Sequence, residues 1–139
     1  MLRTTLLTVV LALVAAFAQP ALAQTAGADG VLRDPAGRTL YVFDRDHAWG
    51  ASSCYEGCAE AWPAFVAKIG AEVTGEMTVH TRTDGRMQWG WNGKPLYTFA
   101  GDHAPGDAEG DGLGGVWHAV RIRSPEPPPT ATLAGAAPG

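Results

Sequence analysis

Two cysteines four residues apart, Cys54 and Cys58, are the first candidates for chemistry in this chain of 139 residues. Thiolates at this spacing suit a thiol–disulfide pair or soft Cu(I), because one helical turn brings the two sulfurs together. A binuclear copper motif would have His and Met where Trp62 and Phe65 stand, and haem attachment would have His where Ala59 stands. We favour a structural disulfide, contributing about 2 kcal/mol, and keep a redox or copper role as the alternative.

Histidines form the second candidate set: His47, His80, His103 and His118. Imidazole and carboxylate groups bind copper and zinc, and Asp46 and Asp102 each precede one of these histidines. Neighbouring residues of a strand point to opposite sides, so neither Asp-His pair can chelate a metal ion as a unit. We expect no cofactor, and keep a copper or zinc site on these histidines as the alternative.

An acidic glycine loop reads Asp107-Ala-Glu109-Gly-Asp111-Gly and is similar at its start to the calcium loop of an EF-hand. His118 stands at position 12, where that loop needs Glu, and no flanking helices are predicted. A solvated glycine-rich loop is the favoured interpretation. The chain has no Gly-x-Ser-x-Gly, His-Glu-x-x-His or phosphate-loop motif, so we expect no enzyme activity.

Aromatic side chains offer a further kind of site. The five tryptophans are Trp49, Trp62, Trp89, Trp91 and Trp117. Most of them are expected in the core. Trp89 and Trp91 share one predicted strand face, opposite to the face of Tyr97 and Phe99, and are the candidates for a surface that stacks against a flat ligand.

The elements that must position these residues form a tandem repeat. Residues 37–50 and 93–106 align without a gap, and eight of 14 positions are identical. The identical pairs include Tyr41/Tyr97, Phe43/Phe99 and Asp46/Asp102. Tyr and Phe, two residues apart on a strand, share a face, and the Asp can turn back to accept hydrogen bonds from backbone N–H groups or a Tyr hydroxyl. The repeat is therefore predicted to build the fold rather than to form a doubled active site.

The fold class is predicted to be mainly β, a single small domain of two pseudo-repeated β-hairpin units with one short helix. Strands are predicted at residues 31–33, 39–43, 77–83, 86–91, 94–99 and 116–122. The turn pairs Asp84-Gly85 and Asn92-Gly93 predict hairpins with two-residue loops. That register places Trp89 opposite His80 on one side and Leu96 on the other, with Val79 on the opposite face.

The helix is predicted from the capping box of Ser53 and Glu56, which places Cys54 in the first turn. Pro63 should end it near Ala61 or Trp62.

The ends of the chain have a different character. Residues 1–23 have the pattern of a secretory signal peptide cleaved after Ala23. The domain is expected over residues 29–123, after a loose leader from Gln24, and a disordered Pro/Ala/Gly tail over residues 124–139.

Without Arg3 the chain carries nine basic and 14 acidic residues, a net charge of −5, which argues against nucleic acid as a partner. No stretch after the signal peptide is apolar enough to span a membrane.

The paired Tyr-x-Phe-x-x-Asp motif resembles a family of bacterial secreted repeat proteins and lipoproteins. The likeness includes Cys54, Cys58 and Trp62-Pro63 after the first unit, and residues 114–118 after the second. It implies an exported protein without established activity. No Cys follows the cleavage point to carry lipid, so we expect a periplasmic or secreted form.

Together these patterns predict a non-catalytic binding or structural module of the cell envelope. Its expected partner is an envelope protein or a small ligand. The alternative is a periplasmic metal-binding or thiol-redox protein.

Overall fold

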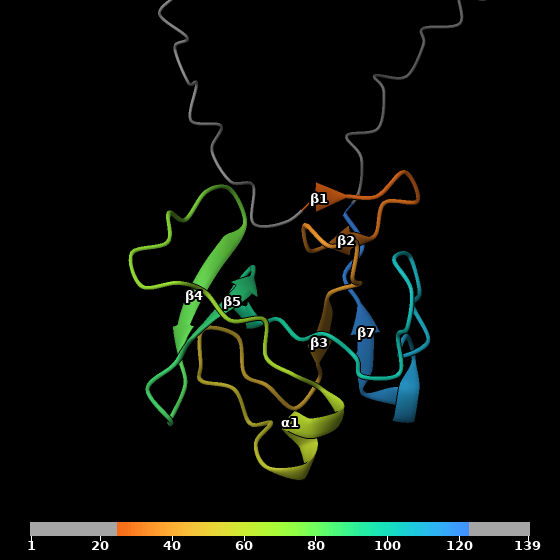
Figure 1. The fold of residues 1–139 in the computed structure, drawn as a ribbon. Helices are drawn as coiled ribbons and strands as arrows, with labels where there is room; N and C mark the ends of the chain where they lie inside the picture. The colour runs from red at the N-terminus through yellow and green to blue at the C-terminus, as the bar shows by residue number, and fades with distance from the viewer. Residues whose placement is uncertain (1–24, 123–139) are drawn as a thin grey trace, which may run out of the picture.

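The structure, a computed structural model, describes residues 25–122 and is mainly β, as predicted. The predicted signal peptide and tail lie outside the described residues. The elements are β1 (Thr25–Ala26), β2 (Leu32–Arg33), β3 (Tyr41–Phe43), α1 (Gly57–Ala61), β4 (Met77–Thr81), β5 (Met87–Trp91), β6 (Lys94–Pro95), the 3₁₀ turn η1 (Leu113–Gly115) and β7 (Trp117–Ala119). Within that range the strands form three small antiparallel sheets, β1–β2, β3–β7 and β4–β5–β6. Figure 1 shows α1 at the end of the molecule opposite to β1 and β2.

The two repeat units meet at their tyrosines. The Tyr41 N–H donates to the Tyr97 carbonyl at 2.8 Å, and the Tyr97 N–H donates to the Tyr41 carbonyl at 2.9 Å. Two residues that exchange both bonds form the hydrogen-bonded pair of an antiparallel ladder. Because the two tyrosines occupy the same position of the repeat, a local two-fold pseudo-symmetry axis passes between them.

The strand at the end of the domain completes the first unit. β7 pairs with β3 in a register that places Phe43 opposite Trp117, and Val31 bridges to Arg121 further along. The predicted hairpin of residues 31–43 is present, with Arg33 bridged to Thr39. The two units therefore share strand pairing instead of folding as separate hairpins.

The turn at Asn92-Gly93 follows the prediction. β5 pairs with β6 so that Trp91 lies opposite Lys94, and Leu96 donates its N–H to the Trp89 carbonyl. Asn92 and Gly93 have φ of 48° and 80°, the positive values that a type I′ turn requires at both central positions. The predicted strand of residues 94–99 is shorter than expected, because beyond Leu96 the chain leaves β5 and Tyr97 pairs with Tyr41 instead.

The prediction for the turn at Asp84-Gly85 is wrong by one residue. The Arg82 N–H donates to the Arg86 carbonyl, so three residues form the loop. Val79 therefore lies opposite Trp89, and His80 lies opposite Gln88. A shift of one residue exchanges the two faces of a strand, so Val79 shares the face of Trp89 and not that of Tyr97.

The core consists of two clusters of buried apolar side chains. The first comprises Val31, Tyr41, Phe43, Cys54, Trp62, Tyr97, Trp117 and Ala119. The second comprises Leu32, Leu40, Ala67, Met77, Trp89, Leu96 and Val120. The apolar face of the meander β4–β5–β6 contributes Met77 and Trp89 to the second cluster. Its other face buries polar residues, His80, Arg82 and Gln88.

The helix differs from the prediction at its start. The capping box does not form, because the Ser53 hydroxyl donates to Asp46 and no side chain caps the first turn. Helix α1 begins at Gly57, so Cys58 and not Cys54 lies in its first turn. It ends at Ala61, as predicted, with Trp62 as the following residue. At the other end of the domain, β1 begins within the expected leader and pairs with β2.

Candidate functional site

The repeated motif places its tyrosines and aspartates in reciprocal contact. The Tyr41 hydroxyl donates to Asp102 Oδ2 at 2.7 Å, and the Tyr97 hydroxyl donates to Asp46 Oδ2 at 2.5 Å. Each bond therefore joins the Tyr of one unit to the Asp of the other. Both tyrosines are fully buried. The spacing predicts an Asp that accepts from a Tyr hydroxyl, but not that the two belong to different units.

The second carboxylate oxygen of each motif aspartate accepts hydrogen bonds from the segment that follows it. Asp46 Oδ1 accepts from the N–H and the hydroxyl of Ser53, at 2.8 and 2.6 Å. Asp102 Oδ1 accepts from the Glu109 N–H at 2.8 Å. In both units the donor stands seven residues after the aspartate. The carboxylates thus organise the same loop in each half of the molecule.

The tyrosine hydroxyls are held in their protonated form. Burial raises the pKa of Tyr41 well above its ordinary value, and the bond to Asp102 raises it further. Burial and then the bond to Asp46 raise the pKa of Tyr97 in the same way. A phenol that stays protonated remains a donor to its carboxylate, so the arrangement suits a permanent hydrogen bond and not proton transfer near neutral pH.

Four aromatic rings stack in a row between the two units. The centroids of Trp62 and Trp117 are 3.8 Å apart with an interplanar angle of 4°. Phe43 stacks on Trp117 at 4.2 Å, and Phe99 stacks on Trp62 at 4.3 Å. Each outer ring comes from the unit opposite to the tryptophan it covers. The motif phenylalanines are therefore part of the core.

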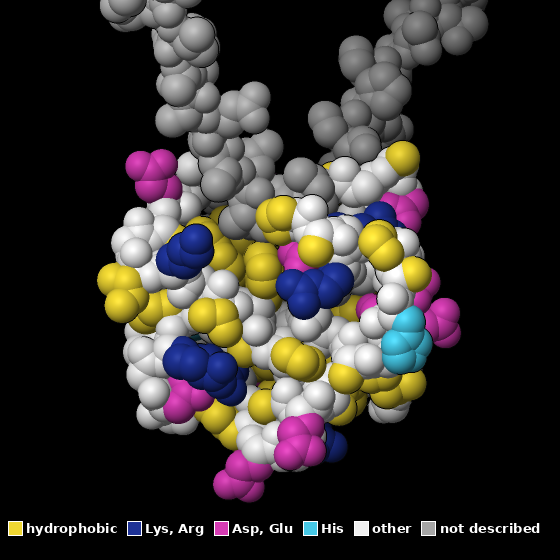
Figure 2. Space-filling view, viewed as in Figure 1, with side chains coloured by type: hydrophobic (Ala, Val, Ile, Leu, Met, Phe, Trp, Pro, Cys, Tyr) yellow, Lys and Arg dark blue, Asp and Glu magenta, His cyan; other side chains and the backbone are white. Residues whose placement is uncertain are grey.

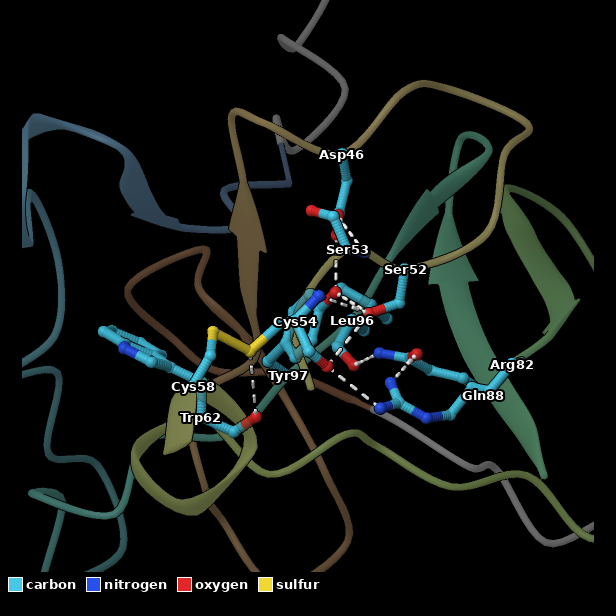
Figure 3. Close-up of a disulfide and its surroundings, with 10 residues drawn as sticks. All are labelled: Asp46, Ser52, Ser53, Cys54, Cys58, Trp62, Arg82, Gln88, Leu96 and Tyr97. Carbon is cyan, nitrogen blue, oxygen red and sulfur yellow. Dashed lines mark hydrogen bonds between the residues drawn. A yellow bond between two sulfur atoms is a disulfide. The ribbon is translucent and has the colours of Figure 1, made fainter. Parts of the chain in front are cut away.

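The disulfide between Cys54 and Cys58 is present, as predicted, with 5.3 Å between the two Cα atoms. Figure 3 shows it beside Trp62 and the polar residues of the adjoining loop. The Ser52 hydroxyl lies 2.5 Å from the Tyr97 hydroxyl and accepts the Cys54 N–H at 3.1 Å. Cys54 is fully buried, while Cys58 is half-buried. The disulfide loop is thus joined to the motif through Tyr97.

A buried arginine joins the disulfide loop to the meander. Arg82 donates to the Cys54 carbonyl at 2.9 Å and to Gln88 Oε1 at 2.7 Å, and Gln88 in turn donates to the Leu96 carbonyl (Figure 3). The guanidinium lies 4.3 Å from the centroid of the Tyr55 ring, a cation–π contact. The sequence gives no signal for this arginine, because an alternation pattern does not indicate which polar residue of a strand is buried.

The four histidines occupy separate places. His80 is buried, with Nδ1 donating to the Gly50 carbonyl at 3.0 Å and Nε2 at 2.8 Å from Thr78 Oγ1. His118 Nε2 lies 2.8 Å from Asp44 Oδ2 on the surface, and His47 and His103 are exposed. Among residues 25–122, no three His, Cys, Asp or Glu side chains are grouped so that they could hold a metal ion.

The acidic glycine loop uses its carboxylates as internal acceptors. Asp107 accepts the N–H groups of His103 and Ala104 at 2.9 Å each, and these two bonds lower the pKa of Asp107. Asp111 accepts the Ala119 N–H at 2.9 Å, and its other oxygen pairs with Arg121 at 2.5 Å. The loop is held by these bonds against β7.

The expected ligand surface at Trp89 and Trp91 is wrong for Trp89, which is 7 % exposed and packs in the second core cluster. Trp91 is half-buried against the same cluster. The tryptophan that reaches solvent is Trp49, which is 74 % exposed. The repeat alignment contains a signal for it, since Pro105 occupies the matching position of the second unit.

These features define a class of protein: a small tandem-repeat β domain whose motif residues form hydrogen bonds between its two halves. The chain belongs to the family described as a secreted repeat of unknown function, which it matches over residues 25–66 and again over residues 78–121. The two matches correspond to the two units. No curated protein and no solved structure matches the chain. Within residues 25–122, the structure contains no helix with the length and apolar character needed to cross a bilayer.

Proposed function

We propose that the protein is an exported, non-catalytic module of the cell envelope that acts by binding or as a structural element. The observation that carries this proposal is the reciprocal pairing of the motif, Tyr41 with Asp102 and Tyr97 with Asp46. A general acid or base must reach the proton of a substrate. Here the repeated hydroxyls are buried and already bonded to the repeated carboxylates, so the part of the sequence that is duplicated serves the fold.

The proposed location is the periplasm or the extracellular medium, with cleavage after Ala23. The amino-terminal pattern of residues 1–23 and membership of a secreted-repeat family support it. The Cys54–Cys58 disulfide also supports it, because disulfides persist in oxidising compartments. The proposed partner is an envelope protein or a small ligand, with no cofactor.

Metal analysis of the exported protein, purified without a His tag, tests this proposal against the metal-binding alternative. We expect copper and zinc well below one equivalent, in the parent and in a His47→Ala/His103→Ala variant alike. One equivalent of either metal in the parent, lost in the variant, would contradict the proposal and support a metal-binding protein.

A thiol-redox role is the second candidate, and the half-buried position of Cys58 favours it. The test is reduction of the native protein at neutral pH followed by thiol titration. A structural disulfide should react slowly until denaturant is added, because Cys54 is fully buried. Rapid reduction and reoxidation with an unchanged near-ultraviolet circular dichroism spectrum would instead support the redox role.

A further inference from the structure

Trp49 combines high exposure with an unusual backbone conformation. Its side chain is 74 % exposed, and its φ is 66°. A bulky residue rarely adopts positive φ, and such residues persist where the surrounding structure holds them, often at sites of function. The fold therefore maintains a strained turn at a residue whose side chain is mostly outside the core.

The turn is fixed on both sides of Trp49. The Trp49 N–H donates to the Gly93 carbonyl at 2.7 Å, and His80 donates to the carbonyl of Gly50 at 3.0 Å. The indole ring packs against Gly93 so closely that a Cβ at that position would come within 2.6 Å of the ring. The ring is therefore pre-positioned against the backbone, and most of its surface remains open to solvent.

The matching turn of the second unit shows that architecture does not need this arrangement. Pro105 occupies the position of Trp49 and packs over Gly37, where a Cβ would come within 2.8 Å of the proline. Gly106 supplies the N–H that bonds to the Gly37 carbonyl, at 3.0 Å. Pro105 thus covers its glycine without positive φ of its own, and the turn takes its positive φ at Gly106, at 91°, where glycine adopts it without strain. The positive φ of Trp49 and its exposed indole are therefore not needed to close the turn.

The surroundings of the ring indicate the chemistry of its ligand. His47 and Asn92, both exposed, lie in the two turns that meet at the Trp49–Gly93 contact and carry hydrogen-bonding side chains. The other large apolar residues that are exposed belong to different loops: Val66, Ile69, Val73 and Leu113. In the view of Figure 2, apolar and charged side chains are interspersed over the surface. A stable protein interface needs a broader apolar centre than one ring.

We propose that Trp49 is the stacking platform of a saccharide-binding site, with His47 and Asn92 as the residues that bond to hydroxyl groups. A pyranose ring presents a flat C–H face bordered by hydroxyls, so its face can stack on an exposed indole while imidazole and amide groups from the two adjoining turns bond to its hydroxyls. This inference rests on the proposed function as a binding module and names the class of its ligand.

The test is a titration of the exported protein with chitotetraose and with cellotetraose, followed by calorimetry and by the emission of tryptophan. The parent should bind at least one of them saturably. Trp49→Ala should bind about ten-fold more weakly or not at all, because the stacking face is lost. The control Leu113→Ala, which removes an exposed apolar side chain from another loop, should bind as the parent does.

Thermal unfolding of Trp49→Gly separates binding from folding. Glycine adopts positive φ without strain, so this variant should melt no lower than the parent while losing the saccharide. Absence of saturable binding by the parent, equal binding by Trp49→Ala, or melting of both Trp49 variants well below the parent would each overturn the saccharide site. The proposed non-catalytic function fails on a different result, the metal content or thiol behaviour described above.

Discussion

The two repeat units share their motif but close the following segment by different means. In the first unit, Cys54 and Cys58 form a disulfide. In the second, the residue aligned with Cys54 is Gly110, which lies directly beneath Trp62, where a Cβ would come within 2.6 Å of the ring. The chain continues there through three glycines at positive φ: Gly112, and Gly114 and Gly115 in η1.

This difference shows which part of each unit is architectural. The Tyr–Asp bonds, the bond seven residues beyond each Asp and the stacked rings recur in both halves. The disulfide and the exposed indole of Trp49 occur in the first half and have no counterpart in the aligned positions of the second. Features beyond the shared architecture are therefore expected in the first unit.

The largest effect is expected from the central stack. Trp62→Ala and Trp117→Ala should each lower the free energy of unfolding by about 3–5 kcal/mol, because each removes a buried ring that contacts both units. Urea unfolding monitored by far-ultraviolet circular dichroism measures the loss. Trp62→Phe and Trp117→Phe retain a ring and serve as controls with smaller losses. Strongly unequal losses between the two Ala variants would contradict a symmetric core.

The next effect concerns the reciprocal hydrogen bonds. Tyr97→Phe should lower the free energy of unfolding by about 1–3 kcal/mol, because it leaves Oδ2 of the buried Asp46 carboxylate without its tyrosine donor. Tyr41→Phe should cause a smaller loss, since its partner Asp102 is only half-buried. Chemical denaturation of both variants measures the ranking. The reverse order would mean that burial of the carboxylate does not decide the loss.

Removal of the disulfide is expected to have a moderate effect. The Cys54→Ser/Cys58→Ser variant should be less stable by about 2 kcal/mol, because the bond closes only a short loop. Arg82 still bonds to the carbonyl of residue 54, so the loop should keep its place. Thermal unfolding with and without reductant measures the change, and the double variant should be insensitive to reductant. A loss as large as that of Trp62→Ala would make the disulfide, and not the stack, the main constraint of the first unit.

The smallest effect is expected at alkaline pH, where the ionisation of Tyr41 and Tyr97 should affect stability. The pKa values of Tyr41 and Tyr97 are raised in the folded protein, so their contribution is complete below the ordinary pKa of 10.0 and decreases as the pH rises above it. In that range stability should fall by about 1.4 kcal/mol per pH unit for each tyrosine that ionises only on unfolding. Unfolding midpoints measured between about pH 8 and 11, on both sides of the ordinary phenol pKa, check this. Tyr97→Phe should show a shallower decline, and an unchanged slope would contradict the assignment.

The accuracy of prediction differed between the two turns of the meander. Asn92-Gly93 predicted its loop correctly because both residues tolerate positive φ, which fixes a two-residue turn locally. Asp84-Gly85 carries a similar signal but forms a three-residue loop. That register directs Arg82 and His80 towards the segment of residues 50–54, where they bond to backbone carbonyls. Those contacts are distant in sequence, so the dipeptide alone could not indicate them.

The candidate sites divide in the same way. The disulfide was predictable, because two nearby cysteines in a chain with a signal-peptide pattern favour a bond. The burial of Trp89 was not, since alternation in a strand does not state which face is covered. The exposure of Trp49 was not predicted either. The alignment with Pro105 marks a difference between the units, but the exposure depends on backbone φ and on contact with Gly93, 44 residues further along the chain.

By itself, the sequence determined the mainly β character, the repeat, the membership of a secreted family and the disulfide, because each of these depends on residue types at short spacing. The tertiary structure decided that Tyr41 bonds to Asp102 and Tyr97 to Asp46, across the units and not within them. It also decided which tryptophans are buried. The physical reason is that an identical motif offers the same partners locally and across a pseudo-two-fold axis, and only the packing of the two halves selects between them.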